Sequence, residues 1–169
     1  MINIVKLIVL KRQDQILLLI AFLCFFSLAV VLISQHVFNV QPCAWCITHR
    51  LIFSTIFIIS FLSILFNKHS LYNLFISPIS ILILSISGFI GSWKQYNVDN
   101  LLSCNATFGD WLINFFKFDI MIPWLFQIQS SCSDSSFTLI GINYPIWNFG
   151  VYIILLLLVC TKLILILKF

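Results

Sequence analysis

Charged residues are scarce in this chain of 169 residues, where they make up 8% of the sequence and only five are acidic. A water-soluble domain carries roughly a quarter charged residues. Hydrophobic residues reach 62% here, and the mean hydropathy is +1.12. The basic excess gives a net charge of +4, but the basic residues are scattered and form no patch for nucleic acid. The composition therefore indicates a membrane protein of one domain without a nucleic-acid partner.

Several common cofactor and targeting motifs are also missing. The five glycines form no glycine-rich nucleotide fingerprint. Ile47 follows Cys46, which excludes the C-x-x-C-H motif that attaches haem. The first apolar run is too long for the core of a secretory signal, and no A-x-A cleavage site follows it. We therefore expect this run to be retained as a membrane span.

Four uncharged or nearly uncharged runs reach the length of about 20 residues that a membrane-spanning helix needs. They cover approximately residues 15–34, 47–66, 74–93 and 145–167. Backbone polar groups cannot stay unpaired in lipid, so these spans should be helices. The sequence predicts an all-α membrane protein, an antiparallel bundle of four transmembrane helices that forms a single domain over residues 1–169. Lys162 is expected to snorkel toward the membrane surface near the end of the last span.

Two loops on one side of the membrane should connect these spans, at about residues 35–46 and 94–144. The second is the only long hydrophilic region. In it, apolar and polar residues alternate around Asp110 to Phe126. Such a mixture predicts a short amphipathic helix in the headgroup plane, interrupted at Pro123.

The distribution of lysine and arginine predicts the orientation, because short cytoplasmic loops carry an excess of both. One side has Lys6, Lys11, Arg12, Lys68, Lys162 and Lys168, and the other has Arg50, Lys94 and Lys117 beside Asp99, Asp110, Asp119 and Asp134. We expect the first side to be cytoplasmic and to hold both termini. The loop cysteines then face the outer compartment, where disulfides persist.

Cys43 and Cys46 form a C-x-x-C at the entrance of the second span. At the start of a helix this spacing brings two sulfurs to one face, and the helix N-terminus favours a thiolate. Arg50 follows Cys46 by one helical turn, which places a fixed positive charge beside that sulfur. The alternative role for Arg50 is a headgroup anchor, but its register with Cys46 favours a function. His49 points elsewhere and is either a helper or an interface residue.

Cys104 and Cys132 lie in the long outer loop. The four loop cysteines permit three pairings, and local reach favours Cys43–Cys46 and Cys104–Cys132 as the resting disulfides. Two structural staples are the alternative. Zinc is disfavoured because the spacings do not match paired zinc ligands. The two remaining cysteines lie deep in the first and fourth spans and are expected to be inert packing residues: Cys24 and Cys160.

A C-x-x-C at the lipid boundary can pass electrons to an acceptor dissolved in the bilayer. Re-oxidising a strong thiol oxidant requires an acceptor of still higher potential. Because nucleotide and haem motifs are absent, a membrane quinone is the economical choice, either ubiquinone or menaquinone. A non-catalytic four-span scaffold of tetraspanin type, stapled by disulfides, is the alternative from a different class.

Four sequence features occur together in this chain: Gln35-His36-Val37, Pro42-Cys43-Ala44-Trp45-Cys46 with Arg50, the separated Cys104 and Cys132, and the stretch from Leu139 to Trp147. In this combination the chain resembles the DsbB family, the quinone-linked disulfide oxidoreductases of bacterial inner membranes. The resemblance covers most of the chain. It implies catalytic roles for all four loop cysteines and a quinone-binding role for Arg50 and Cys46.

The resemblance also implies an electron path. A reduced DsbA-like periplasmic carrier with a thioredoxin fold would attack at Cys104, and the released Cys132 would exchange with Cys43. The freed Cys46 thiolate would contact the quinone, with Arg50 supporting the negative charge. Electrons would leave as quinol, and both disulfides would form again.

One departure from the family concerns the outer end of the third span. Some members have a histidine there that assists the quinone. Here the neighbourhood is Trp93-Lys94-Gln95-Tyr96-Asn97, without a histidine, and Lys94 is a candidate replacement as a cationic donor. A vitamin K epoxide reductase-like relay is a further enzyme alternative, but in that family the C-x-x-C opens the last span rather than the second.

Overall fold

Four long helices form the body of the protein in a computed structural model. They are α1 (Ile2–Val37), α2 (Ala44–Leu65), α3 (Ser77–Val98) and α7 (Tyr144–Leu167). The structure describes residues 2–39, 42–65, 75–98, 111, 115, 117, 120, 122–126, 138–139 and 142–167. Cys104 and Cys132 therefore lie outside the described residues.

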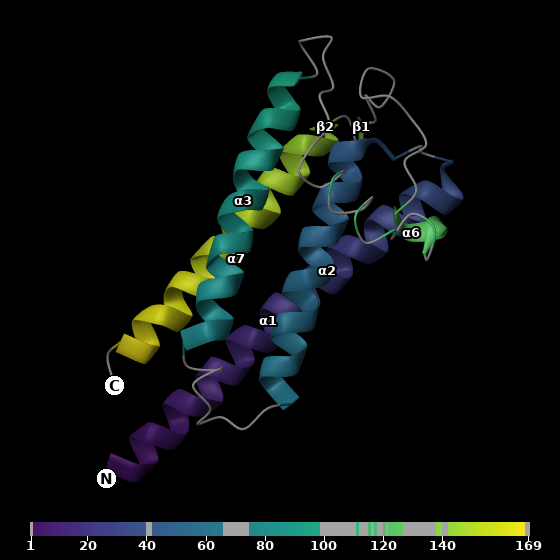
Figure 1. The fold of residues 1–169 in the computed structure, drawn as a ribbon. Coiled ribbons are helices and arrows are strands. Elements are labelled where there is room, and N and C mark those ends of the chain that lie inside the picture. The colour runs from purple at the N-terminus through teal and green to yellow at the C-terminus, as the bar shows by residue number, and fades with distance from the viewer. Residues whose placement is uncertain are drawn as a thin grey trace.

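The four helices pack as an antiparallel bundle. Successive helices run in opposite directions, and both chain ends lie at one end of the bundle (Figure 1). α1 packs mainly against α2, and α3 against α7. Each helix contains a stretch that is long and apolar enough to cross a membrane, namely Gln13–Val37, Ala44–Leu65, Ser77–Asn97 and Tyr144–Leu167. The expected all-α membrane bundle is confirmed.

The start of α2 coincides with the C-x-x-C. The carbonyl oxygen of Cys43 accepts a hydrogen bond from the Ile47 N–H at 3.1 Å, so Cys43 is the N-cap residue and Cys46 lies in the first turn. α1 ends at Val37, and Asn39 follows with a φ of 52°. Asparagine tolerates this left-handed conformation, which commonly terminates helices. A short connection therefore brings α2 back along α1.

α3 extends further toward the second loop than expected. It begins at Ser77 rather than near residue 74 and continues to Val98 rather than to residue 93. Pro78 is accommodated because its missing N–H lies in the first turn, where helices make no internal donor bonds. The extension matters because it places Gln95 on a regular helix.

Two small elements lie at the end of the bundle that carries the N-termini of α2 and α7 and the C-terminus of α3, called here the loop end. α6 (Pro123–Phe126) is the described helix of the expected amphipathic stretch, most of which lies outside the described residues. Pro123 is its first residue rather than an interruption, as suits a proline. Phe126 is buried against Ile47 of α2. α6 thus packs on the start of α2.

A short hairpin leads into α7. β1 (Thr138–Leu139) pairs antiparallel with β2 (Ile142–Asn143), and Tyr144 follows as the first residue of α7. The sequence did not predict this hairpin. It fixes the direction in which the chain enters the last helix and so places Tyr144 at the loop end.

The main core fills the middle of the bundle with Ile16, Leu17, Ile20, Cys24, Ile52, Phe53, Ile56, Ile81, Tyr152, Leu155 and Val159. Two glycines bring α3 close to this core. A Cβ at Gly88 would overlap the Tyr152 ring, and one at Gly91 would lie 3.4 Å from His49 Cε1. Small residues of this kind let membrane helices approach closely. α3 therefore contacts Tyr152 and His49 directly.

The expectation that Lys162 snorkels to the surface is wrong. Its side chain is 1% exposed and lies on the interior face of α7. Asp14 on α1 supplies an attractive opposite charge. Charged groups within membrane spans usually face the bundle interior and pair with one another. The Lys162 Nζ makes no hydrogen bond among the described residues, so Asp14 acts on it only as a nearby opposite charge.

Candidate functional site

Cys43 and Cys46 are adjacent at the start of α2, and both are thiols. Their sulfurs lie 3.2 Å apart, with the Cys43 S–H as donor and the Cys46 Sγ as acceptor. Cys43 is 1% exposed, whereas Cys46 is partly exposed. The S–S bond of a disulfide is about 2.05 Å long, so these thiols are close enough to form one when two electrons and two protons are removed. The resting disulfide between them stays a prediction.

The start of α2 gives Cys46 the setting of a thiolate. The partial positive charge of a helix N-terminus acts on groups in the first turn. The Arg50 guanidinium interacts electrostatically with the sulfurs of both cysteines. Cys46 Sγ also accepts a second hydrogen bond, from Gln95 Nε2 at 3.8 Å. Two hydrogen-bond donors and a nearby cation are contacts that stabilise negative charge on this sulfur once it forms.

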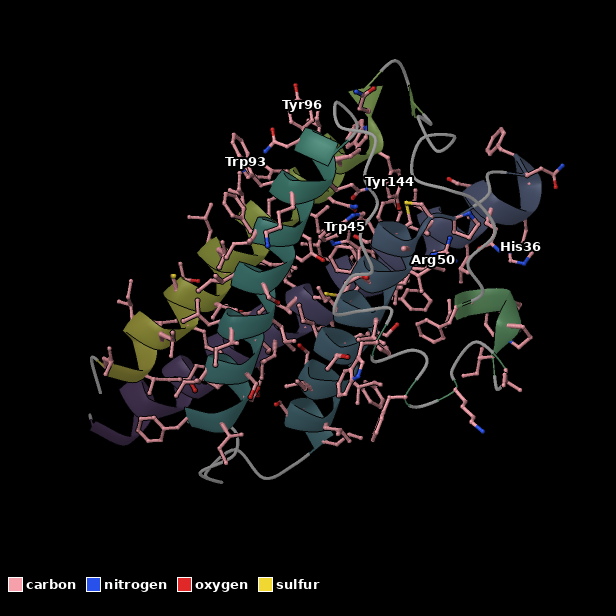
Figure 2. All side chains as sticks on the ribbon, turned by 45° about the horizontal axis from the view of Figure 1, so that its top comes forward. His36, Trp45, Arg50, Trp93, Tyr96 and Tyr144 are labelled. Atoms are coloured by element: carbon pink, nitrogen blue, oxygen red, sulfur yellow. The ribbon has the colours of Figure 1, made fainter. Side chains whose placement is uncertain are left out.

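Arg50 connects three segments of the chain and is 3% exposed. Its Nη1 donates to Gln35 Oε1 on α1 at 2.6 Å and to the carbonyl oxygen of Leu125 on α6 at 2.9 Å. Figure 2 shows Arg50 on the α1 side of α2. Its Nε finds no hydrogen-bond partner among the described residues. Burial and these bonds argue against a headgroup anchor, and the Nε–H stays available as a donor within the described residues.

Gln95 is the site residue that sequence reasoning missed. Its side chain is buried, and its amide donates to Cys46 Sγ. The neighbouring Lys94, which the sequence suggested as a cationic donor, is exposed. The two differ because successive residues on a helix point about 100° apart. At this end of α3, the group that reaches the sulfur is therefore an amide rather than an ammonium.

His49 faces the bundle interior rather than the membrane interface. It is 2% exposed, and its Nδ1 lies 3.0 Å from the Tyr152 hydroxyl. The two rings are 5.5 Å apart, and Tyr152 stacks on Phe53 at 4.9 Å. The interface role considered for His49 does not fit this position.

A small apolar pocket opens on the seam between α3 and α7 at the loop end. Its volume is about 140 Å³, and its lining consists of Ser92, Trp93, Tyr96, Pro145, Ile146 and Phe149. Figure 2 shows Trp93 and Tyr96 on the flank of the bundle away from Arg50. The pocket shares the loop end with the thiol pair, but none of the predicted site residues lines it.

The remaining predicted residues separate into two groups. Cys104 and Cys132 lie outside the described residues, so their pairing and their distance from Cys43 stay predictions. Cys24 packs in the core as expected. Cys160, in contrast, is exposed on the surface of α7, so it is not a packing residue.

The chain is similar to known disulfide bond formation proteins. A family model described as "Disulfide bond formation protein DsbB" matches residues 13–161. Disulfide bond formation protein B 2 of Pseudomonas aeruginosa is 26% identical over 143 residues, which cover 80% of this chain and 82% of that protein. Disulfide bond formation protein B of Polaromonas naphthalenivorans is 28% identical over 144 residues, covering 83% and 84%. The matched region includes the four loop cysteines and Arg50.

Proposed function

Since this chain belongs to the DsbB family of disulfide bond formation proteins, we propose that it re-oxidises a DsbA-like thiol carrier and passes the electrons to a membrane quinone. Family membership makes it a disulfide-forming oxidoreductase, and four apolar helices make it a multi-pass membrane protein. The observation that carries the proposal is the juxtaposition of Cys43, Cys46 and Arg50 at one helix N-terminus.

Two cysteine pairs relay the electrons in this proposal. A carrier thiolate attacks Cys104 of a Cys104–Cys132 disulfide, forms a mixed disulfide and releases Cys132. Cys132 attacks Cys43 of a Cys43–Cys46 disulfide and releases Cys46 as a thiolate. The second carrier thiolate resolves the mixed disulfide, so the carrier leaves oxidised and Cys104 is freed. Cys104 then attacks Cys132 of the Cys43–Cys132 disulfide, which re-forms the Cys104–Cys132 bond and releases Cys43. Transfer of two electrons and two protons from Cys43 and Cys46 to the quinone would restore the Cys43–Cys46 bond.

The burial of Cys43 constrains this sequence of exchanges. A thiolate must reach the sulfur that it attacks, and Cys43 is 1% exposed. Whatever covers Cys43 must move before Cys132 can exchange with it. Cys46, which is partly exposed, needs no such movement to meet a small acceptor.

The residues around Cys46 fit a quinone. A bound quinone supplies a sink that takes up two electrons and two protons and becomes quinol. Its carbonyl oxygens are hydrogen-bond acceptors, and Arg50 Nε is a buried donor that has no partner in the described part of the chain. Arg50 would donate this N–H to a carbonyl oxygen, and its positive charge would stabilise the Cys46 thiolate. Ubiquinone and menaquinone both offer such oxygens.

We place the loop end of the bundle at the periplasmic face of the inner membrane and both termini in the cytoplasm. The excess of lysine and arginine on the terminal side supports this orientation. Both termini lie at the opposite end of the bundle from the start of α2 (Figure 1). In this orientation the thiol pair meets the oxidising compartment in which disulfides are made.

Reconstitution in lipid vesicles tests the proposal. The full chain is mixed with a reduced DsbA-like carrier and with ubiquinone, menaquinone or no quinone, and carrier thiols and quinone are counted over time. We expect one quinone to be consumed for each carrier disulfide, because both are two-electron couples. Sustained carrier oxidation without quinone would contradict the quinone step. A folded chain that oxidises no carrier with either quinone would instead be the stapled scaffold.

A further inference from the structure

Three buried polar side chains from three different helices lie in a row behind Cys46. Tyr152 of α7 is 0% exposed, His49 of α2 is 2% exposed, and Gln95 of α3 is 6% exposed. Tyr152 belongs to the apolar core. A polar group in such surroundings is costly unless it is hydrogen-bonded. Each of these three side chains is therefore expected to have a hydrogen-bond partner.

Hydrogen-bond contacts are present at both ends of this row. The Tyr152 hydroxyl lies 3.0 Å from His49 Nδ1, and Gln95 Nε2 donates to Cys46 Sγ at 3.8 Å. Between them, His49 Nε2 and Gln95 Oε1 have no hydrogen-bond partner among the described residues. Gln95 is nevertheless close enough to His49 to act on its imidazole electrostatically. Two unsatisfied atoms thus belong to side chains that already lie side by side.

One assignment of protons satisfies every group in the row. If the Tyr152 hydroxyl donates to His49 Nδ1, the imidazole carries its proton on Nε2. The Nε2–H then donates to Gln95 Oε1, and the Gln95 amide donates to Cys46 Sγ. The opposite direction would aim the Gln95 oxygen at the sulfur, where it would repel a thiolate. Only the first direction suits negative charge on Cys46.

We infer that Tyr152, His49 and Gln95 form one directed hydrogen-bond chain that ends on Cys46 Sγ and stabilises its thiolate. The inference rests on the proposed role of Cys46 as the thiolate that gives up electrons. Gln95 contacts the reacting sulfur, whereas His49 and Tyr152 are positioning residues that act through it. A donor in such a network is polarised by the donor behind it. The chain therefore extends the charge stabilisation by Arg50 to the other side of Cys46.

The shape of α3 supports this arrangement. Gly88, Gly91 and Gln95 follow one another at intervals of three and four residues and so lie on one face of the helix. Side chains at the two glycines would meet Tyr152 and His49 respectively. Because the two glycines have no side chains, α3 can approach α2 and α7 closely, and this approach brings the Gln95 amide to Cys46 Sγ. This face of α3 thus makes room for Tyr152 and His49 and carries Gln95 itself.

Alkylation of Cys46 tests the inference without quinone or carrier. The reduced full chain in lipid nanodiscs is treated with iodoacetamide across a range of pH, and modified Cys46 is quantified by mass spectrometry. In Gln95→Leu we expect the rate at neutral pH to fall about threefold, because a tenfold loss of thiolate is partly offset by greater nucleophilicity. At strongly alkaline pH every thiol is ionised, so only the greater nucleophilicity remains, and Gln95→Leu should react about threefold faster than the wild type.

The alkylation rates of the wild type and of Gln95→Leu, plotted against pH, should therefore cross. This crossing distinguishes stabilisation of the thiolate from an effect on packing alone. A structural change that only blocks access would slow alkylation at every pH. Tyr152→Phe removes only the hydroxyl and should shift the curve in the same direction by a smaller amount, and the exposed neighbour variant Lys94→Leu should leave it unchanged. Equal curves for the wild type, Gln95→Leu and Tyr152→Phe, or uniform slowing, would overturn the inference. Because no quinone is present, this result is independent of whether quinone turnover occurs.

Discussion

Replacing either Cys43 or Cys46 with serine should abolish quinone reduction by a reduced carrier. The two sulfurs lie 3.2 Å apart as donor and acceptor, and neither can close the disulfide alone. Removal of a reacting nucleophile typically costs roughly 10⁴-fold or more in turnover. Quinone loss in reconstituted vesicles, followed by its ultraviolet absorbance, should fall to the level of vesicles without protein.

Cys160→Ala provides the matched control for these variants. Cys160 is exposed on α7, away from the start of α2, so its loss should leave the rate unchanged. Retained turnover in Cys43→Ser or Cys46→Ser would rule out the proposed electron path. Equal losses in all three variants would point to a folding defect, which near-ultraviolet circular dichroism would reveal.

Arg50→Ala should raise the apparent KM for quinone far more than the apparent KM for the carrier. Arg50 is buried, its charge acts on both sulfurs, and its Nε–H has no hydrogen-bond partner in the part of the chain that the structure describes. A hydrogen bond from a charged group contributes about 1.5–3 kcal/mol, which corresponds to roughly ten- to a hundredfold in KM. Initial rates with each substrate varied in turn measure both constants.

Two further variants sharpen this test. Arg50→Lys keeps the charge but loses the planar fork of donors, so it should give an intermediate KM. Lys94→Ala removes an exposed cation from the same end of the bundle and should change neither constant. A quinone dependence that stays the same in Arg50→Ala would assign Arg50 only the structural task of joining Gln35 and Leu125.

Relations within a single helix could be predicted from the sequence. Cys43, Cys46 and Arg50 all lie at the start of α2, so helical periodicity alone brings them to one face. The four spans followed in the same way from the lengths of the apolar runs. Both predictions depend on local geometry, which residue spacing specifies directly.

Contacts between helices could not be predicted in this way. Gln95 reaches Cys46 across 49 positions of the chain, and Arg50 reaches Leu125 across 75. Lys94 drew attention in the sequence because it is charged, yet the rotation of α3 turns Gln95 toward the sulfur. Periodicity shows which residues share a face, but packing decides which face meets the site.

The side of α7 that faces the bundle interior could not be predicted from the sequence for a related reason. α7 is apolar over most of its length, so the depth of a residue in this span does not tell which side of the helix it faces. Cys160 therefore proved exposed and Lys162 buried, the reverse of what depth in the span suggested. The attraction between Lys162 and Asp14 became visible only when α1 and α7 were placed together.

The most direct test of the account is the visible absorption spectrum of the Cys43→Ser variant as quinone is added in nanodiscs. This variant keeps Cys46 but cannot form its disulfide, so a thiolate at Cys46 should remain against the quinone. The account predicts a thiolate–quinone absorption band that is absent when Cys46→Ser is titrated in the same way. A spectrum equal to the sum of protein and quinone, or a band that persists without Cys46, would contradict it.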